Sequence, residues 1–197
     1  MKKLLFLLLV LSVSLFALVS CGGTGDGAGG GDGAPVDEEA WLDATKDSNF
    51  QNVTFDMRCS ARGTEIPDNA EVFSAKLNPD KVEIDGVVQT DELTITSLRS
   101  WYVESSLAIL DNFDNFEYDA ENDCFVSKTD IVYNVTVMGY DAKITASNVS
   151  VSLDDNMNIA KIVCDMDQEF IDDNNEPEKF ELYVEFKFYD YGTTVVG

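Results

Sequence analysis

The alternation of apolar and polar side chains with a period of two is the feature that most constrains this chain. It is clearest near the C-terminal end, where apolar residues occupy every second position: Phe180, Leu182, Val184, Phe186 and Phe188. The positions between them carry acidic, basic and tyrosine side chains. Successive side chains of a strand point to opposite faces, so one face is buried and the other is wet. The pattern therefore predicts an antiparallel sheet with one solvated side.

Further segments with strand-like composition follow one another along most of the chain. We expect strands over residues 53–59, 72–77, 82–88, 93–96, 116–118, 124–126, 131–137, 144–153 and 159–166. Asn and Asp residues between neighbouring segments, such as Asp154-Asp155-Asn156, are typical of turns. Asp85-Gly86 falls inside the third segment and indicates either a tight turn or a bulge.

Two segments carry helical patterns instead. Asp37 is a favourable N-cap, and the acidic residues that follow it suit the positive end of a helix dipole, so a short helix is expected to end near residue 47. A second helix is expected over residues 99–113. Its apolar residues fall on one face, at positions i, i+4, i+7 and i+10: Val103, Leu107, Leu110 and Phe113.

The N-terminal segment determines where the protein is expected to reside. Lys2 and Lys3 precede an apolar run, and the small Ser20 stands directly before Cys21. A basic start, an apolar stretch and a small residue are typical of a secretory signal peptide. The junction of Ser20 and Cys21 resembles the bacterial lipobox. This resemblance implies that residues 1–20 are removed and that palmitate-type acyl chains on Cys21 anchor the protein to the extracytoplasmic face of the cell membrane.

Two other interpretations of this segment stay open: a signal peptide cleaved without lipidation, and a retained transmembrane helix. The apolar stretch is about 17 residues long, which is the lower limit for crossing a bilayer. Residues 21–36 begin with Cys21 and are rich in glycine, which predicts a flexible linker. Residues 37–197 contain no second linker, so we expect them to form a single extracytoplasmic β-rich domain.

The charge of the chain excludes several classes of partner. Its 13 basic and 37 acidic residues give a net charge of −24, and removal of Lys2 and Lys3 with the signal peptide takes it from −24 to −26. A surface this acidic repels nucleic-acid backbones and anionic lipid headgroups. We therefore expect no nucleic-acid partner, and we expect the acyl anchor, not charge, to hold the protein at the membrane as a monomer.

The chain contains no histidine, which removes the commonest general base and metal ligand and the usual forms of Ser-His-Asp and Cys-His chemistry. Beyond Cys21, the cysteines are Cys59, Cys124 and Cys164, without the paired spacing of a zinc site. Free thiols in the core are favoured, with a single disulfide as the alternative. The sequence thus predicts no enzyme, no cofactor and no metal centre.

Acidic clusters at three expected turns make calcium the one metal that the sequence does not exclude. They lie at residues 119–123, 154–156 and 172–176. Calcium requires several oxygens converging on one point, and none of these clusters has the spacing of an EF-hand loop. Asp and Asn also form turns in their own right. We interpret the clusters as turns, with calcium binding as the alternative.

The chain resembles small surface lipoproteins of Gram-positive gut bacteria. An opening of the form E-x-W…N-F-x-N-V-T matches Glu39 to Trp41 and residues 49–54, and an ending of the form F-x-D-Y-G-T-T matches residues 188–194. Some of these proteins have a fold similar to the LolA/LppX lipoprotein carriers. The resemblance implies an α+β fold in which a curved antiparallel sheet forms a half-barrel. The N-terminal helix and an inserted helix would pack on one face and cover a site for acyl chains.

The resemblance and the inward-facing residues together suggest a carrier or sensor that binds a hydrophobic, lipid-like ligand. Large apolar side chains predicted to face inward are the candidates for its pocket: Phe55, Met57, Leu107, Leu110, Phe113, Phe186 and Phe188. An ordinary filled core is the competing interpretation of the same residues. The alternative function is a cell-surface recognition module for a glycan or protein, which would use tyrosines of the wet face: Tyr183, Tyr189 and Tyr191.

Overall fold

A computed structural model describes residues 37–64, 66–67, 70, 72–99, 103, 105–137, 140–171 and 177–197. The predicted signal peptide, the lipidated Cys21 and the glycine-rich linker lie outside these residues. The predictions made for them are therefore neither supported nor contradicted by the fold.

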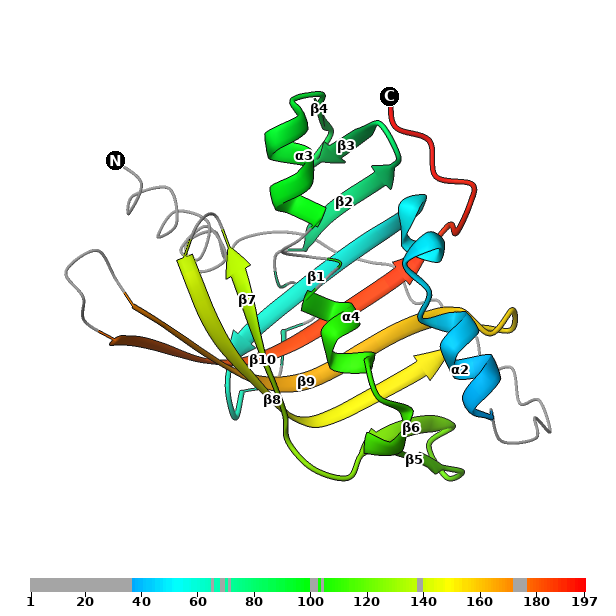
Figure 1. The fold of residues 1–197 in the computed structure, drawn as a ribbon, viewed down its shortest axis with the longest axis vertical. Coiled ribbons are helices and arrows are strands. Elements are labelled where there is room, and N and C mark those ends of the chain that lie inside the picture. Colours follow the sequence, from blue (N-terminus) through cyan, green and yellow to red (C-terminus); the bar gives the residue numbers. More distant parts are fainter. Residues whose placement is uncertain are drawn as a thin grey trace.

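The described residues form one open, ten-stranded antiparallel sheet (Figure 1), as the period-two pattern predicted. Its order is β4-β3-β2-β1-β10-β9-β8-β6-β5, and β7 also pairs with β8. The strands are β1 (Val53–Ala61), β2 (Phe73–Asn78), β3 (Lys81–Ile84), β4 (Val87–Gln89), β5 (Phe116–Asp119), β6 (Cys124–Ser127), β7 (Ile131–Val137), β8 (Tyr140–Leu153), β9 (Ile159–Ile171) and β10 (Pro177–Tyr189).

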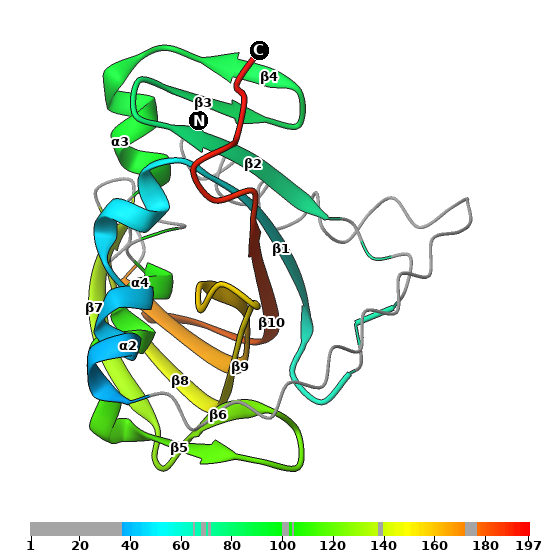
Figure 2. The same cartoon turned by 90° about the vertical axis from the view of Figure 1, so that its right-hand side faces the viewer.

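Short helices connect or precede the strands. They are α2 (Glu38–Ala44), the 3₁₀ helix η1 (Asp47–Gln51), α3 (Glu92–Arg99), α4 (Ser105–Leu110) and the 3₁₀ helix η3 (Phe113–Asn115). Figure 2 shows the sheet curving around α2 and α4, which lie on its concave side. The hydrophobic core lies between these helices and the sheet. The open antiparallel sheet with helices on one face therefore agrees with the expected arrangement.

One predicted strand is wrong. Residues 93–96 lie inside α3, where the Ile95 backbone N–H donates to the Asp91 carbonyl oxygen at 3.0 Å. Four residues are too few to separate a period of 2 from a period of 3.6, so Leu93 and Ile95 alone did not identify a strand. The helix predicted over residues 99–113 is divided in the structure, because Arg99 ends α3, α4 is short and Phe113 begins η3. Residues 100–102 and 104 lie outside the description.

Two predicted turns are confirmed with their geometry. Asp85 and Gly86 have φ values of +48° and +80° and join β3 to β4, so this segment is a tight turn and not a bulge. A two-residue turn of this kind requires positive φ at both positions, which glycine adopts without steric cost. The turn after β8 is closed by the Asp154 carboxylate, whose Oδ1 accepts backbone N–H groups of Asn156 at 2.9 Å and Asn158 at 2.8 Å.

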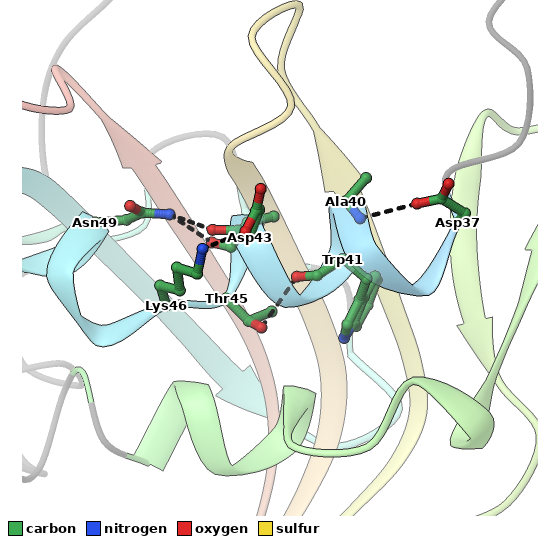
Figure 3. A network of polar contacts seen from close by, with 8 residues as sticks. Asp37, Ala40, Trp41, Asp43, Thr45, Lys46 and Asn49 are labelled. Atoms are coloured by element: carbon green, nitrogen blue, oxygen red, sulfur yellow. Dashed lines mark hydrogen bonds and ion pairs between the residues drawn. The ribbon is translucent and has the colours of Figure 1, made fainter.

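The predicted cap of α2 is also confirmed (Figure 3). Asp37 Oδ1 accepts a hydrogen bond from the Ala40 backbone nitrogen at 2.9 Å, which satisfies one of the free N–H groups of the first turn. At the other end, Thr45 Oγ1 donates to the Trp41 carbonyl oxygen at 3.0 Å. The Asn49 side chain then donates to the Asp43 carbonyl oxygen at 2.7 Å, which ties η1 to α2.

Trp41 fastens α2 to the rest of the core. Its side chain is fully buried, and its ring centroid lies 4.9 Å from that of Phe116, 5.1 Å from Phe125 and 5.5 Å from Phe113. Its indole Nε1 donates to the Leu110 carbonyl oxygen at 3.1 Å. This bond satisfies a carbonyl at the C-terminal end of α4, where helix carbonyls lack partners within the helix. One side chain therefore joins α2, α4, η3 and the β5–β6 hairpin.

Candidate hydrophobic site on the concave face

The register of the sheet places the residues of the concave face in rows across the strands. Phe55 on β1 is opposite Phe188 on β10, and Phe186 is opposite both Met57 on β1 and Ile162 on β9. Phe55 lies 5.2 Å from Phe188 and 5.8 Å from Phe186 between ring centroids. The structure therefore brings together four of the seven residues predicted for a pocket: Phe55, Met57, Phe186 and Phe188.

Most of these candidates belong to the packed core. Phe55, Leu110, Phe186 and Phe188 are at most 4 % exposed. Met57, Leu107 and Phe113 are partly buried and pack against the same core. Phe113 and the Leu110 carbonyl contact Trp41, which packs against the β5–β6 hairpin, so the candidates form two groups on separate elements. At this helix-covered end of the concave face, the core is closely packed.

The other end of the concave face is less covered. Beyond the row that holds Leu182, Met166 and Ala146, the register gives two further rows of inward-facing residues. We call them the outer rows. They consist of Phe180, Gln168, Ile144 and Tyr133 in one row and of Glu178, Phe170, Ala142 and Val135 in the next.

Within the outer rows, Ile144 is 4 % and Ala142 9 % exposed, whereas the residues around them are less completely buried. Phe180, Phe170, Tyr133 and Val135 are half-buried, although they point to the same side of the sheet as the closed core. The rings of Phe170 and Phe180 stack with centroids 5.4 Å apart. Figure 1 shows that the corresponding ends of β7 to β10 extend past α4. A concave apolar surface of this kind is the usual setting of a small-molecule site.

Two polar groups face into the outer rows. The Tyr133 hydroxyl is removed from solvent and has no hydrogen-bond partner among the described residues. Burial raises the pKa of Tyr133 far above its ordinary value, and nearby Cys164 adds to the shift, so the hydroxyl keeps its proton and stays a donor. Gln168 Nε2 donates to the sulfur of Met166 at 3.2 Å, which is a weak acceptor.

The three cysteines beyond Cys21 lie in or against the hydrophobic core. Cys59, Cys124 and Cys164 are free, as the sequence favoured. Burial raises the pKa of Cys164 to about 12 and also raises that of Cys59. The nucleophilic form of cysteine is the thiolate, so neither of these two thiols is activated at neutral pH. Among the described residues, no group of three or more Cys, Asp or Glu side chains is arranged to hold a metal ion.

Two of the three acidic clusters have a structural role in their turns. Asp119 accepts hydrogen bonds from the Glu121 backbone nitrogen at 3.0 Å and from Asn122 Nδ2 at 2.7 Å. Asp154 closes the next turn in the same manner, as described above. Asp is suited to these positions because its carboxylate accepts hydrogen bonds from the backbone N–H groups that follow it in the turn. The third cluster, residues 172–176, lies outside the described residues.

The convex face carries paired charges and two of the three predicted recognition tyrosines. Lys161 Nζ lies 2.7 Å from Glu185 Oε2, and Lys179 Nζ lies 3.0 Å from Asp167 Oδ2. Tyr183 is half-buried on this face, and Tyr189 is 41 % exposed, with its hydroxyl donating to Asp56 at 3.1 Å. Tyr191 does not belong to this surface.

Tyr191 is instead an internal anchor. Its hydroxyl donates to the Ile159 carbonyl oxygen at 2.7 Å, and its ring lies edge-on to Phe50 with centroids 5.8 Å apart. Tyr191 follows the end of β10, so the alternation of that strand does not determine which way its side chain points. The prediction that it faces the solvent is wrong for this reason.

Several residues of the outer rows were absent from the predicted pocket, although their positions were within reach of the sequence. Tyr133 and Val135 continue the alternation of Ile131, and Phe170 lies four positions after Met166 on the same face. Their inward direction was therefore predictable. The sequence had no signal that these residues would be less buried than Phe55, Phe186 and Phe188 on the same face.

Within the described residues, the helices are all too short or too polar to cross a membrane. No family model, no curated protein and no solved structure matches this chain. Membership of the LolA/LppX family, suggested by the sequence, therefore stays a prediction. What is established is an open antiparallel sheet whose concave apolar face is closed at one end and partly exposed at the other.

Proposed function

We propose that this protein is a lipid-anchored, extracytoplasmic, non-catalytic protein that binds a hydrophobic, lipid-like ligand on the outer rows of its concave face. The observation that supports the proposal most directly is the difference in burial along that face. Phe55, Phe186 and Phe188 are almost completely buried, whereas Phe170 and Phe180, on the same face, are half-buried.

Partly exposed apolar surface is unfavourable in water, at roughly 25 cal/mol for each Å². A ligand that covers the outer rows removes this cost, and the closely packed core beside them provides a rigid wall. The anchor proposed at Cys21 would hold this surface within one flexible linker of the membrane, where acyl lipids are abundant. The site and the anchor thus support the same class of ligand.

The test compares two substitutions on β7. Val135 lies in the outer rows and is half-buried, whereas Val132 is on the opposite face and 56 % exposed. The full chain is purified with Cys21→Ser, so that no covalent acyl chain contributes, and its bound lipids are extracted and identified by mass spectrometry. Val135→Glu should reduce the amount of bound acyl lipid severalfold, because it places a charge in the apolar site, and Val132→Glu should leave it unchanged.

Equal lipid content in Val135→Glu, Val132→Glu and the parent protein would contradict the proposal, since it would place the lipid elsewhere. The absence of acyl lipid from all three would also contradict it. In that case the recognition of a glycan or protein would be the function to examine next. The exposed Tyr189 and its neighbour Tyr183 on the convex face are the residues that favour this alternative.

A further inference from the structure

The most unusual polar atom of the concave face is the hydroxyl oxygen of Tyr133. It is buried and has no hydrogen-bond partner among the described residues. Tyr133 shares the inward direction of Ile131 and Val135, so its ring lies on the apolar side of the sheet. A buried hydroxyl without a partner is unfavourable, and native proteins keep few of them. A polar atom from outside the chain is therefore expected to complete this site.

A second polar group lies in the same row. Tyr133 is opposite Ile144, which is opposite Gln168, so the two residues are two strands apart, about 10 Å across the sheet. The amide of Gln168 bonds a thioether, which is a weak acceptor that a stronger one can replace. Tyr133 and Gln168 thus offer hydrogen-bonding capacity on either side of the buried Ile144.

The residues around Tyr133 and Gln168 indicate the polarity and charge of the rest of the ligand. The stacked rings of Phe170 and Phe180 and the side chain of Val135 form an apolar surface that continues toward the strand ends. Glu178 is exposed in the same row as Phe170. Together with a net charge of −24, this carboxylate opposes an anionic ligand. The chemistry that fits is an uncharged polar end joined to an apolar chain.

We propose that the Tyr133 hydroxyl hydrogen-bonds the uncharged, hydroxyl- or ester-bearing end of a single-chain amphiphile, such as a monoacylglycerol, whose acyl chain covers the outer rows. This inference rests on the proposed function and specifies its ligand class. The polar end lies at the Tyr133 hydroxyl, and the chain extends over Val135, Phe170 and Phe180. The phenol donates a hydrogen bond to the ligand oxygen or accepts one from its hydroxyl group.

The test uses the full chain in its membrane fraction and two photoreactive probes with the same diazirine-bearing acyl chain. One probe is a monoacylglycerol and the other is the free fatty acid, which is anionic at neutral pH. Cross-linked peptides are mapped by mass spectrometry. The monoacylglycerol should label β7 and the end of β9 that carries Phe170, and the fatty acid should label them more weakly.

Tyr133→Phe removes only the hydroxyl group and keeps the ring. The monoacylglycerol concentration for half-maximal labelling should rise by ~3- to 10-fold, the usual effect of one hydrogen bond. The melting temperature should stay the same or rise, because the buried unpaired group is gone. Tyr183→Phe is the matched control on the opposite face, and it should leave the labelling unchanged.

The possible outcomes separate the two proposals. Labelling of the outer rows that is equal for both probes and unaffected by Tyr133→Phe would overturn the role of the hydroxyl and keep the hydrophobic site. No labelling of the outer rows by either probe would overturn both. A change in half-maximal concentration confined to the monoacylglycerol probe and to Tyr133→Phe would support the inference.

Discussion

At the scale of single residues, Trp41 makes the most consequential contact of the N-terminal helix. Its ring fills the space between three phenylalanines, and its indole nitrogen satisfies the Leu110 carbonyl oxygen. The sequence identified Trp41 only as part of a helix and of a resemblance motif. The nearest partner of its side chain along the sequence is Leu110, which is 69 positions away, and the three phenylalanines are farther still. Local patterns do not contain such contacts.

Trp41→Ala should lower the free energy of unfolding by about 3–5 kcal/mol, because it leaves a large cavity in a closely packed core. Trp41→Phe should cost less, since it keeps an aromatic ring and loses mainly the bond to Leu110, about 1 kcal/mol. Urea titration followed by circular dichroism measures both values. Leu42→Ala is the control, because Leu42 is 52 % exposed and its loss should change stability by less than about 0.5 kcal/mol. A Trp41→Ala protein as stable as Leu42→Ala would contradict this role.

Cys21 carries the other prediction that belongs to one residue. If a lipid is attached to its thiol, cells grown with an alkyne-bearing palmitate analogue should incorporate the label into the wild-type protein. The Cys21→Ser protein should lose the label and leave the membrane fraction, because several acyl chains on one cysteine supply the anchoring. Cys59→Ser should retain both properties. Label that persists in Cys21→Ser would contradict lipidation at this position.

At the scale of elements, local chemistry predicted most strands, two turns and one helix cap. The alternation of β10, the Asp85-Gly86 turn and the cap at Asp37 all depend on residues close together in sequence. The error at residues 93–96 has the same origin. A segment that short fits both the period of a strand and the period of a helix, and in the structure it belongs to a longer helix, α3.

The cap of α2 provides a test at this scale. Asp37→Ala removes the acceptor of the Ala40 N–H group and should lower the free energy of unfolding by about 1 kcal/mol. Asp43→Ala is the control in the same helix, because its exposed ion pair with Lys46 contributes about 0.5 kcal/mol or less. Thermal or urea unfolding compares the two proteins. An Asp37→Ala protein that is no less stable than Asp43→Ala would show that the cap does not contribute.

At the scale of the whole molecule, the burial of several weak acids should make stability depend on alkaline pH. Burial raises the pKa of Cys164 to about 12 from an ordinary value of 9.0, and it raises those of Tyr133 and Tyr191 above their ordinary value of 10.0. The folded protein then binds these protons more tightly than the unfolded chain. The corresponding stability is present in full below pH 9 and is lost as pH rises through the folded-state pKa values.

Urea midpoints measured between pH 8 and pH 11 should therefore fall as the pH increases. Cys164→Ala should reduce the slope, because it removes one of the three groups, whereas Tyr183→Phe on the convex face serves as a control for general alkaline effects. A urea midpoint that stays constant or rises across this interval would contradict the burial of these groups.

The sequence by itself determined most of the segments that form strands, which face of those strands is apolar, where α2 begins and where two hairpins turn. These features depend on side-chain alternation, caps and turn residues that act within a few positions of each other. Only the tertiary structure decided that the last strand lies at the centre of the sheet, between β1 and β9. It also decided that α2 and α4 lie on the concave side and that Tyr133, Phe170 and Phe180 stay half-buried. Those properties arise from contacts between distant segments, such as Tyr189 and Asp56, 133 positions apart, and local patterns do not encode which distant segments will meet.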